Sequence, residues 1–374
     1  MVLSCLIALL SLLLFATATH ARPKSYAVWA ADSAIARGQG NGLDSSGNSI
    51  VSYEHGEFQW GLRLLYELTG NKTYFDYMQA GVDNIVFPNG TVHGSYTTGP
   101  TFLYLYDKTR LAKYKTASTI FRGQLNSHPR TAQGQFWHKL MYFNQGWLDG
   151  IYMGDPDNAT AWADITSQFQ LMFDNTIQNS TAPNNTGLMY HGYDYSHTAV
   201  WASTDRGHSP EVWDRAVGWY VMAVVDVLEM APENSGHLKP ALLRIINSLV
   251  PKIRDAADPT TGAWWLVMTQ PGRAKNYFES SGTAMFVYAL LKAVRLGYVS
   301  DADGTIVAAA KKAYNYAVVN WVVPNSDGTM GWMNTVVVGV ICCTCQYYVS
   351  QTVDLNDLKG LAAFVLASLE YERL

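Results

Sequence analysis

The chain has 374 residues and a formal net charge of −4, from 26 Lys and Arg against 30 Asp and Glu. No block of basic residues occurs along it, and clustered Lys and Arg are what neutralise phosphate groups, so we do not expect a nucleic-acid partner. A chain of this length can bury a large core and form one large domain or two small ones.

The first residues are typical of a secretory signal peptide. An apolar run from Val2 to Phe15 precedes small residues that offer a cleavage site at Ala18 or Ala21. The run is too short to span a bilayer, and no later segment is apolar for long enough. We therefore expect residues 1–21 to be removed and the mature protein to be secreted, extracellular and free of membrane spans.

Asn-x-Ser/Thr sequons behind such a leader predict a glycoprotein. They occur at Asn71, Asn89, Asn158, Asn179 and Asn184. Removal of the leader leaves Cys342, Cys343 and Cys345, an odd count that permits one disulfide at most, or free thiols. Their spacing is not that of a zinc pair and no His lies nearby, so we expect no metal site.

The dominant pattern in the rest of the chain is helical. Ser209-Pro210-Glu211 supplies an N-cap, a proline at the first helical position and an early acid, and an apolar face follows through Leu228. Another helical pattern, over Tyr53–Thr69, stops at Gly70. Such patterns predict twelve helices, near 25–37, 51–69, 71–86, 99–109, 110–126, 138–154, 158–179, 209–231, 237–257, 276–297, 303–322 and 356–373.

Three stretches break this pattern and are expected to be extended. They are Leu188–Trp201, Gly262–Thr269 and Thr329–Val349, the last including Tyr347-Tyr348-Val349. No Pro/Ser-rich linker divides the chain, so residues 22–374 are expected to form a single domain. Twelve helices can pair as six hairpins closed into a ring, although an open superhelix of hairpins has the same periodicity.

One acid, Asp149, lies among large apolar neighbours in the segment WLDGIYM. Burial disfavours the charged form of a carboxyl group, so we expect the pKa of Asp149 to be raised and its proton to be retained near the working pH. A general acid that cleaves sugars must hold a proton in this way. The structural alternative is that Asp149 bonds a neighbouring backbone group or an Arg.

Polar groups and aromatic rings share a short segment at Trp213-Asp214-Arg215-Ala216-Val217-Gly218-Trp219. Arg215 and Trp219 are four residues apart and so lie on one helix face. Indole rings stack on the faces of pyranose sugars, and a guanidinium can make two hydrogen bonds to one carboxylate. The N-terminus of a helix also favours an anion, so this segment predicts a binding site for an acidic sugar. A structural Arg–Trp pair in the helix wall is the alternative.

Two further segments contribute candidate residues. His191 lies beside a glycine in HGYD, in a stretch outside the helical pattern, which favours a binding role. Trp137 and His138 lie in FWHK, at the start of the segment that leads to Asp149. His138 is about three helical turns from Asp149, so the two side chains could share a face of the expected helix.

These segments together resemble the unsaturated glycuronyl hydrolases, glycoside hydrolase families 88 and 105, the second of which includes unsaturated rhamnogalacturonyl hydrolases. The likeness runs from about residue 50 to the C-terminus. It is carried by FWHK, WLDGIYM, HGYD, SPEVWDRAVGWY, NYFESSGTAMFVYALLKAVRLGY and DLKGLAAFVLASLEYE. The resemblance implies an all-α fold, an (α/α)6 barrel of six helical hairpins with short β additions in loops.

The resemblance implies that Asp149 is the catalytic acid. It places sugar contacts on His191, Trp213, Arg215 and Trp219, and we expect Trp137 to join them. The family usually has another active-site acid before an early helix, whereas this chain reads His93-Gly94-Ser95-Tyr96-Thr97-Thr98-Gly99-Pro100. If that acid only orients sugar or water, His93 or Ser95 could replace it.

The activity implied is removal of an unsaturated (4,5-ene) uronic acid from the non-reducing end of lyase-generated oligosaccharides, those of rhamnogalacturonan first, without a cofactor. Ordinary glycosidases need two carboxylates, whereas one protonated carboxyl can hydrate a vinyl ether. Two alternatives stay open. A conventional hydrolase of saturated glycans would find its second carboxylate among Asp107, Asp155, Asp194, Asp205 and Asp214. A non-catalytic glycan-binding protein would use the Trp and Arg side chains alone.

Overall fold

The structure, a computed structural model, describes residues 23–86, 99–153, 159–179, 185–342 and 344–374. Several expectations lie outside the described residues: the signal peptide, the sequons at Asn89, Asn158 and Asn184, Cys343, and residues 93–98 of the stretch that departs from the family pattern. Within the described ranges, no helix is both long and apolar enough to cross a membrane.

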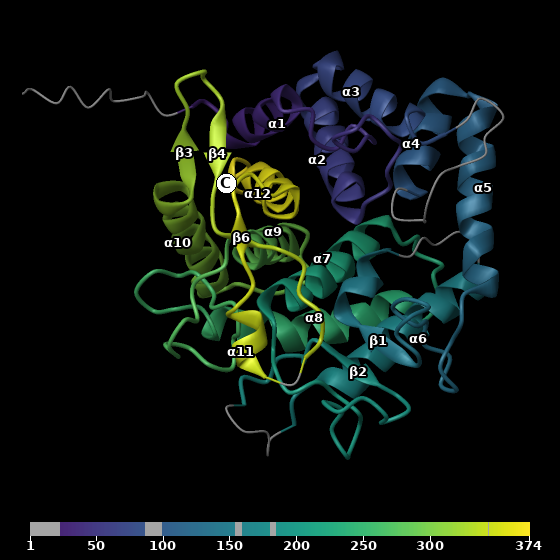
Figure 1. The fold of residues 1–374 in the computed structure, drawn as a ribbon, viewed down its shortest axis with the longest axis vertical. Helices are drawn as coiled ribbons and strands as arrows, with labels where there is room; N and C mark the ends of the chain where they lie inside the picture. Colours follow the sequence, from purple (N-terminus) through teal and green to yellow (C-terminus); the bar gives the residue numbers. More distant parts are fainter. Residues whose placement is uncertain (1–22, 87–98, 154–158, 180–184, 343) are drawn as a thin grey trace, which may run out of the picture.

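Six helices form the inner wall of a barrel (Figure 1). They are α2 (Tyr53–Thr69), α4 (Gly99–Thr109), the short 3₁₀ helix η2 (Leu148–Met153), α7 (Asp214–Met230), α9 (Ser280–Arg295) and α12 (Leu358–Tyr371). Contacts run from η2 through α7, α9, α12 and α2 to α4. Each inner helix packs against outer helices, which are α1 (Tyr26–Ala36), α3 (Lys72–Asp83), α5 (Ala112–Ser127), α6 (Ala159–Thr176), α8 (Leu238–Asp255) and α10 (Thr305–Asn320). The expected all-α barrel of six helical hairpins is confirmed.

Three inner helices, α7, α9 and α12, are buried on nearly every side because inner neighbours and an outer layer enclose them. Every residue of α12 from Leu358 to Glu370 is buried, and so is every residue of α9 from Ser280 to Ala293. The outer helix α8, in contrast, buries one face only. A glycine sets one close approach: a Cβ at Gly218 of α7 would lie 2.8 Å from the sulfur of Met285 in α9.

The first and the last described helices meet in this barrel. Helix α12 packs against α1, and Glu372, just after α12, accepts hydrogen bonds from the first turn of α1. The N–H groups of Tyr26 and Ala27 donate to Glu372 Oε1 at 2.6 and 3.1 Å, and the Ser25 hydroxyl donates to Oε2 at 2.7 Å. A carboxylate there satisfies N–H groups that a helix start leaves without partners.

All but one of the predicted helices are present. The prediction for 138–154 is wrong, because residues 138–144 form turns, Gln145–Trp147 form strand β1 and only η2 is helical. Asn144 has a φ of 54°, which ends any helix there, and a Cβ at Gly146 would lie 2.7 Å from the ring of Tyr193 in the partner strand. The expected strand at Tyr347-Tyr348-Val349 is also wrong, since Cys345–Tyr348 form the short helix α11.

The loops carry three two-stranded antiparallel sheets: β1 with β2 (Gly192–Asp194), β3 (Val322–Pro324) with β4 (Met330–Trp332), and β5 (Thr335–Val336) with β6 (Val353–Asp354). The stretch 262–269, expected to be extended, forms only isolated bridges, to Trp213 and Phe278. The β1–β2 pair matters for function. Trp147 pairs with Gly192, which places the residues that follow β1 beside those that precede β2.

Candidate active site

A cavity of about 740 Å³ opens at the start of three inner helices. Its wall includes Val51, Ser52 and Tyr53 at the start of α2, Asp149 and Gly150 at the start of η2, and Trp213 and Trp219 of the α7 segment. Residues from 124–147 and 338–340 complete it. Of the described residues that line it, Asp149 is the only carboxylate and Lys139 the only Lys or Arg.

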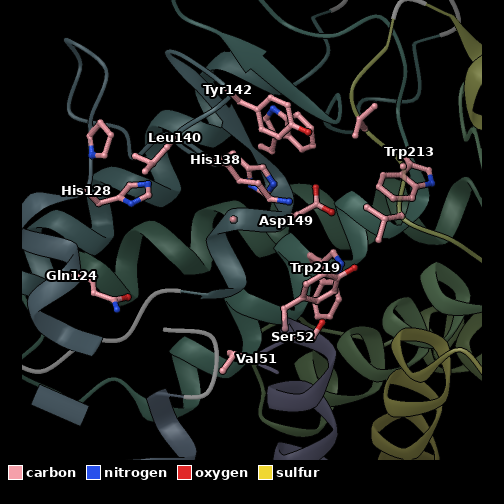
Figure 2. A pocket seen from close by; sticks show the side chains of 18 of the residues that line it. Val51, Ser52, Gln124, His128, His138, Leu140, Tyr142, Asp149, Trp213 and Trp219 are labelled. Carbon is pink, nitrogen blue, oxygen red and sulfur yellow. The ribbon is translucent and has the colours of Figure 1, made fainter. Parts of the chain in front are cut away.

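Asp149 and His191 form a hydrogen-bonded pair in the cavity wall. His191 Nε2 lies 3.0 Å from Asp149 Oδ2, and the two side chains are 0% and 15% exposed. The backbone positions both residues, because Leu148 N–H donates to the His191 carbonyl at 3.0 Å and His191 N–H donates to the Glu211 carbonyl at 3.1 Å. Figure 2 shows the Asp149 carboxylate between His138, Trp213 and Trp219.

The expected rise in the pKa of Asp149 is wrong. Burial does raise the pKa of this carboxyl group, as its apolar neighbours predict, but His191 and His138 together lower it by more. An imidazolium at His191 attracts the carboxylate, and the hydrogen bond that His191 Nε2 makes to Asp149 also favours it, so the net pKa lies below the ordinary value for an aspartate. The apolar segment reveals the burial but not the two histidines.

Stacked rings form the wall above Asp149. His138 and Tyr142 both stack on Trp147, with ring centroids 4.3 and 4.5 Å away. Burial lowers the pKa of His138 to about 4, although Asp149 opposes this, so the ring is neutral at pH 7. His138 does approach Asp149, but by way of the turn and β1 rather than along a helix. Sequence reasoning did not single out Trp147 or Tyr142, although Trp147 lies in WLDGIYM.

Trp213 and Trp219 both reach the cavity, as the spacing in the sequence indicates. Trp213 is the N-cap residue of α7, and its ring lies 4.7 Å from that of His191. Trp219 meets the ring of Tyr53 edge-on at 5.7 Å. Three of the predicted residues (Asp149, Trp213 and Trp219) therefore line the cavity, and His191 supports them from the buried side.

Arg215 does not line the cavity. Its side chain is 1% exposed and pairs with Glu279 of the α9 N-cap at 3.2 Å, while Nε donates to Ser281 Oγ at 2.7 Å. The same guanidinium donates to the carbonyls of Val336 and Val337. It also lies 5.2 Å from the centre of the Trp213 ring. This geometry matches the structural Arg–Trp pair more closely than a sugar contact.

Trp137 lies beside the cavity rather than in its wall. Its indole N–H donates to Asn144 Oδ1 at 3.0 Å, and its ring meets Phe143 edge-on at 4.8 Å. It borders a separate, smaller cavity of about 80 Å³ with His138 and Trp147. Its contacts hold the turn that carries His138 and Tyr142.

None of the other carboxylates considered for catalysis lines the described part of the cavity. Asp107 and Asp205 pair with neighbouring Arg side chains, and Asp194 accepts hydrogen bonds within its own loop. Asp214 is buried at the start of α7, where burial and the nearby Glu279 raise its pKa well above the ordinary value. Asp155 lies outside the described residues.

No group of three or more His, Cys, Asp or Glu side chains able to hold a metal ion occurs where the structure describes the chain. Cys342 and Cys345 are free thiols, and Cys345 is buried.

Comparison with known proteins identifies the family. Residues 29–374 match the model of glycosyl hydrolase family 88. A curated relative, "Protein Atu3128" of Agrobacterium fabrum, is 32% identical over 195 residues, which cover 49% of this chain and 82% of that protein. A solved family 105 glycoside hydrolase of C. acetobutylicum is 34% identical, with a TM-score of 0.84 over 94% of this chain and 100% of that one.

A more distant structure shares the fold alone. The unsaturated glucuronyl hydrolase of Bacillus sp. GL1 is 14% identical, with a TM-score of 0.59 over 93% of this chain and 95% of that one. The resemblance to families 88 and 105 seen in the sequence is thereby confirmed. The chain belongs to glycosyl hydrolase family 88 and its family 105 relatives, and it is a glycoside hydrolase.

Proposed function

We propose that this protein removes a terminal unsaturated uronic acid from oligosaccharides that polysaccharide lyases release. The observation that carries the proposal is a cavity whose described wall contains one carboxylate, Asp149. A conventional glycosidase places two carboxyl groups on either side of the scissile bond. Hydration of a vinyl ether needs a single acid, so one carboxylate suffices.

In the proposed reaction, Asp149 gives its proton to C4, and the electrons of the C4=C5 bond form the new C–H bond. Water adds at C5, and its proton returns to the Asp149 carboxylate, which restores the acid. The hemiketal at C5 opens to a ketone. The leaving sugar then departs from C1 as an alcohol, so that one water is consumed and no cofactor is needed.

The electrostatics of the cavity favour an acidic sugar. The first turns of α2 and α7 border it, and the start of a helix carries partial positive charge. A uronate bound beside Asp149 adds a negative charge, which disfavours a second one and raises the pKa of Asp149. The low pKa of the free site is therefore compatible with a protonated acid once substrate is bound.

For the leaving sugar we propose an apolar face, as in the 6-deoxy sugar rhamnose of rhamnogalacturonan. The loop that lines one side of the cavity exposes Leu140, Met141 and Phe143 by 72, 77 and 58%. Val338, on the wall segment before α11, is 51% exposed. A methyl group or an apolar ring face that covers such side chains removes apolar surface from water, which stabilises the complex by about 25 cal/mol per Å² of apolar surface buried.

We also propose that the protein is secreted and glycosylated. The apolar leader supports secretion. Of the sequons within the described residues, Asn71 at the start of α3 and Asn179 after α6 are both exposed, as glycan attachment requires.

The test is turnover of an unsaturated disaccharide, followed as loss of the ultraviolet absorbance of its C=C bond. We expect the wild type to consume it, and Asp149→Asn to be slower by at least about a hundredfold, the low end for acid–base catalysis. Asp107→Asn is the matched control, since Asp107 is an exposed residue of α4 that pairs with Arg110.

Unchanged turnover in Asp149→Asn would contradict the assignment of the acid. Hydrolysis of saturated oligosaccharides with no loss of absorbance from unsaturated ones would indicate the conventional glycosidase instead. Binding of unsaturated sugar without any turnover would indicate the binding protein.

A further inference from the structure

Tyr348 contacts the Asp149–His191 pair from the side away from the cavity. Its hydroxyl lies 2.9 Å from His191 Nδ1, while His191 Nε2 lies 3.0 Å from Asp149 Oδ2. Tyr348 is 1% exposed and His191 is not exposed at all, so water does not compete for their contact. The three side chains form a hydrogen-bonded row that begins at the cavity and ends in the core.

Glu211 fixes both ends of the Tyr348–His191 contact. Its carboxylate accepts from the N–H of Cys345, the first residue of α11, at 3.0 Å. Thr269 and Gln270 donate to the same carboxylate at 2.9 and 2.6 Å. The backbone carbonyl of Glu211 accepts from His191 N–H at 3.1 Å. The helix that carries Tyr348 is therefore held by the residue that also holds the His191 backbone.

The direction of the hydrogen bonds follows from the chemistry of the two end groups. Burial raises the pKa of Tyr348 well above its ordinary value, so the phenol keeps its proton and can donate it. A neutral imidazole that accepts at Nδ1 carries its proton at Nε2. That Nε2–H then points to Asp149.

We propose that Tyr348 is a positioning residue for the hydrolysis, which holds His191 in the tautomer whose Nε2–H donates to Asp149. Tyr348 is not among the described residues of the cavity wall, so it acts through His191 and not on the sugar. Without its hydroxyl, Nδ1 becomes free to take a proton. A positively charged His191 beside Asp149 then favours the carboxylate over the acid that the reaction needs.

Other ionisable groups surround this row and stay unchanged when Tyr348 loses its hydroxyl. His138 and Tyr53 face Asp149. Glu211 and Cys342 face Tyr348. Their charges therefore affect wild type and variant alike, and a difference between the two reports on the missing hydroxyl.

The first test is the pH profile of Tyr348→Phe. We expect its kcat on an unsaturated disaccharide to fall about tenfold at pH 7, the effect of one lost buried hydrogen bond, with little change in KM. The basic limb of kcat/KM should also move to lower pH, because Asp149 loses its proton more readily. Tyr314→Phe is the matched control, since the Tyr314 hydroxyl donates to Ser368 Oγ at 2.9 Å in the core.

A merely structural role for Tyr348 predicts equal losses of stability in the two variants and no shift of the basic limb, and this result would overturn the proposal.

The effect on rate rests on the proposed function, so a second measurement is independent of turnover. Nitrogen NMR of ring-labelled histidines, with His191→Gln to identify the signal, should find His191 protonated at Nε2 only. In Tyr348→Phe a proton should also populate Nδ1.

A wild-type His191 that carries its proton at Nδ1, or a tautomer that Tyr348→Phe leaves unchanged, refutes the inference even if the enzyme is active. Absence of turnover by the wild type contradicts the proposed function and leaves the NMR result to decide the tautomer.

Discussion

Replacement of Arg215 by Met decides whether this residue holds the barrel together or binds the sugar. The guanidinium crosses from α7 to the N-cap of α9, where it meets Glu279 at 3.2 Å and Ser281 Oγ at 2.7 Å. Arg215 is 1% exposed and Glu279 is fully buried. Burial and the neighbouring Glu279 raise the pKa of Asp214 well above its ordinary value, which favours the neutral form of Asp214, and Arg215 pairs with the negative charge of Glu279.

Arg215→Met leaves that charge without a cation. Glu279 keeps its hydrogen bonds from Ser281, from Gly282 N–H at 2.7 Å and from Val336 N–H at 3.0 Å, but these do not neutralise it. Breaking a buried pair in this way costs about 3 to 5 kcal/mol. With an unfolding entropy of about 2.1 cal/mol/K per residue over roughly 350 residues, the apparent Tm should fall by about 4 to 7 °C.

The assay is thermal unfolding by circular dichroism, together with KM on an unsaturated disaccharide. Arg110→Met makes the same chemical change at a side chain that is 70% exposed and pairs with Asp107, so its Tm should match the wild type. If Arg215→Met unfolds at the same temperature as this control and only KM rises, the reasoning is refuted. Arg215 would then contact the sugar, as the family resemblance implies.

Three further variants test the barrel and the site. Lys292→Met removes the buried cation that donates to Asp226 Oδ1 at 2.6 Å between α9 and α7, and should cost about 3 to 5 kcal/mol in chemical unfolding. Adding Asp226→Leu should recover most of that loss, and no recovery would contradict the pairing. The pKa of Asp149 is lower in the folded protein than in the unfolded chain, where it is about 3.9. The ionised carboxylate therefore stabilises the fold at a pH above about 3.9, and this stabilisation disappears as the pH falls through the pKa of the folded state. Asp149→Asn should therefore be less stable than the wild type at pH 6, and a gap that persists unchanged at pH 2 would contradict the direction of the shift.

Local chemistry made most of the barrel predictable. Helix α2 ends at Gly70, whose φ of 68° is the left-handed cap that a glycine there indicates. Helix α7 follows the predicted cap segment, although it begins a few residues later, at Asp214. Periodicity did not distinguish a closed barrel from an open superhelix, because closure depends on contacts between α12 and α2 at opposite ends of the chain.

The errors fall where distant residues decide the outcome. The residues before Asp149 have the spacing of a helix, but His138 and Tyr142 stack on Trp147 instead. This stack depends on the pairing of strand β1 with strand β2. The pKa of Asp149 depends on His191, 42 residues along the chain. The partner of Arg215 is Glu279, 64 residues away. In each case the local sequence predicts a structure or a role, and a contact with a residue distant in the sequence changes the outcome.

The position of α12 in the barrel bears on how this protein is made. Helix α12 lies between α2 and α9 and is buried on every side, yet the ribosome synthesises it after every other described helix. Until it emerges, α2 and α9 lack the neighbour that shields their apolar sides from water. Closure of the barrel therefore waits for α12, and a stop codon within 358–374 should yield an aggregation-prone chain even though every described residue of the cavity wall has been made.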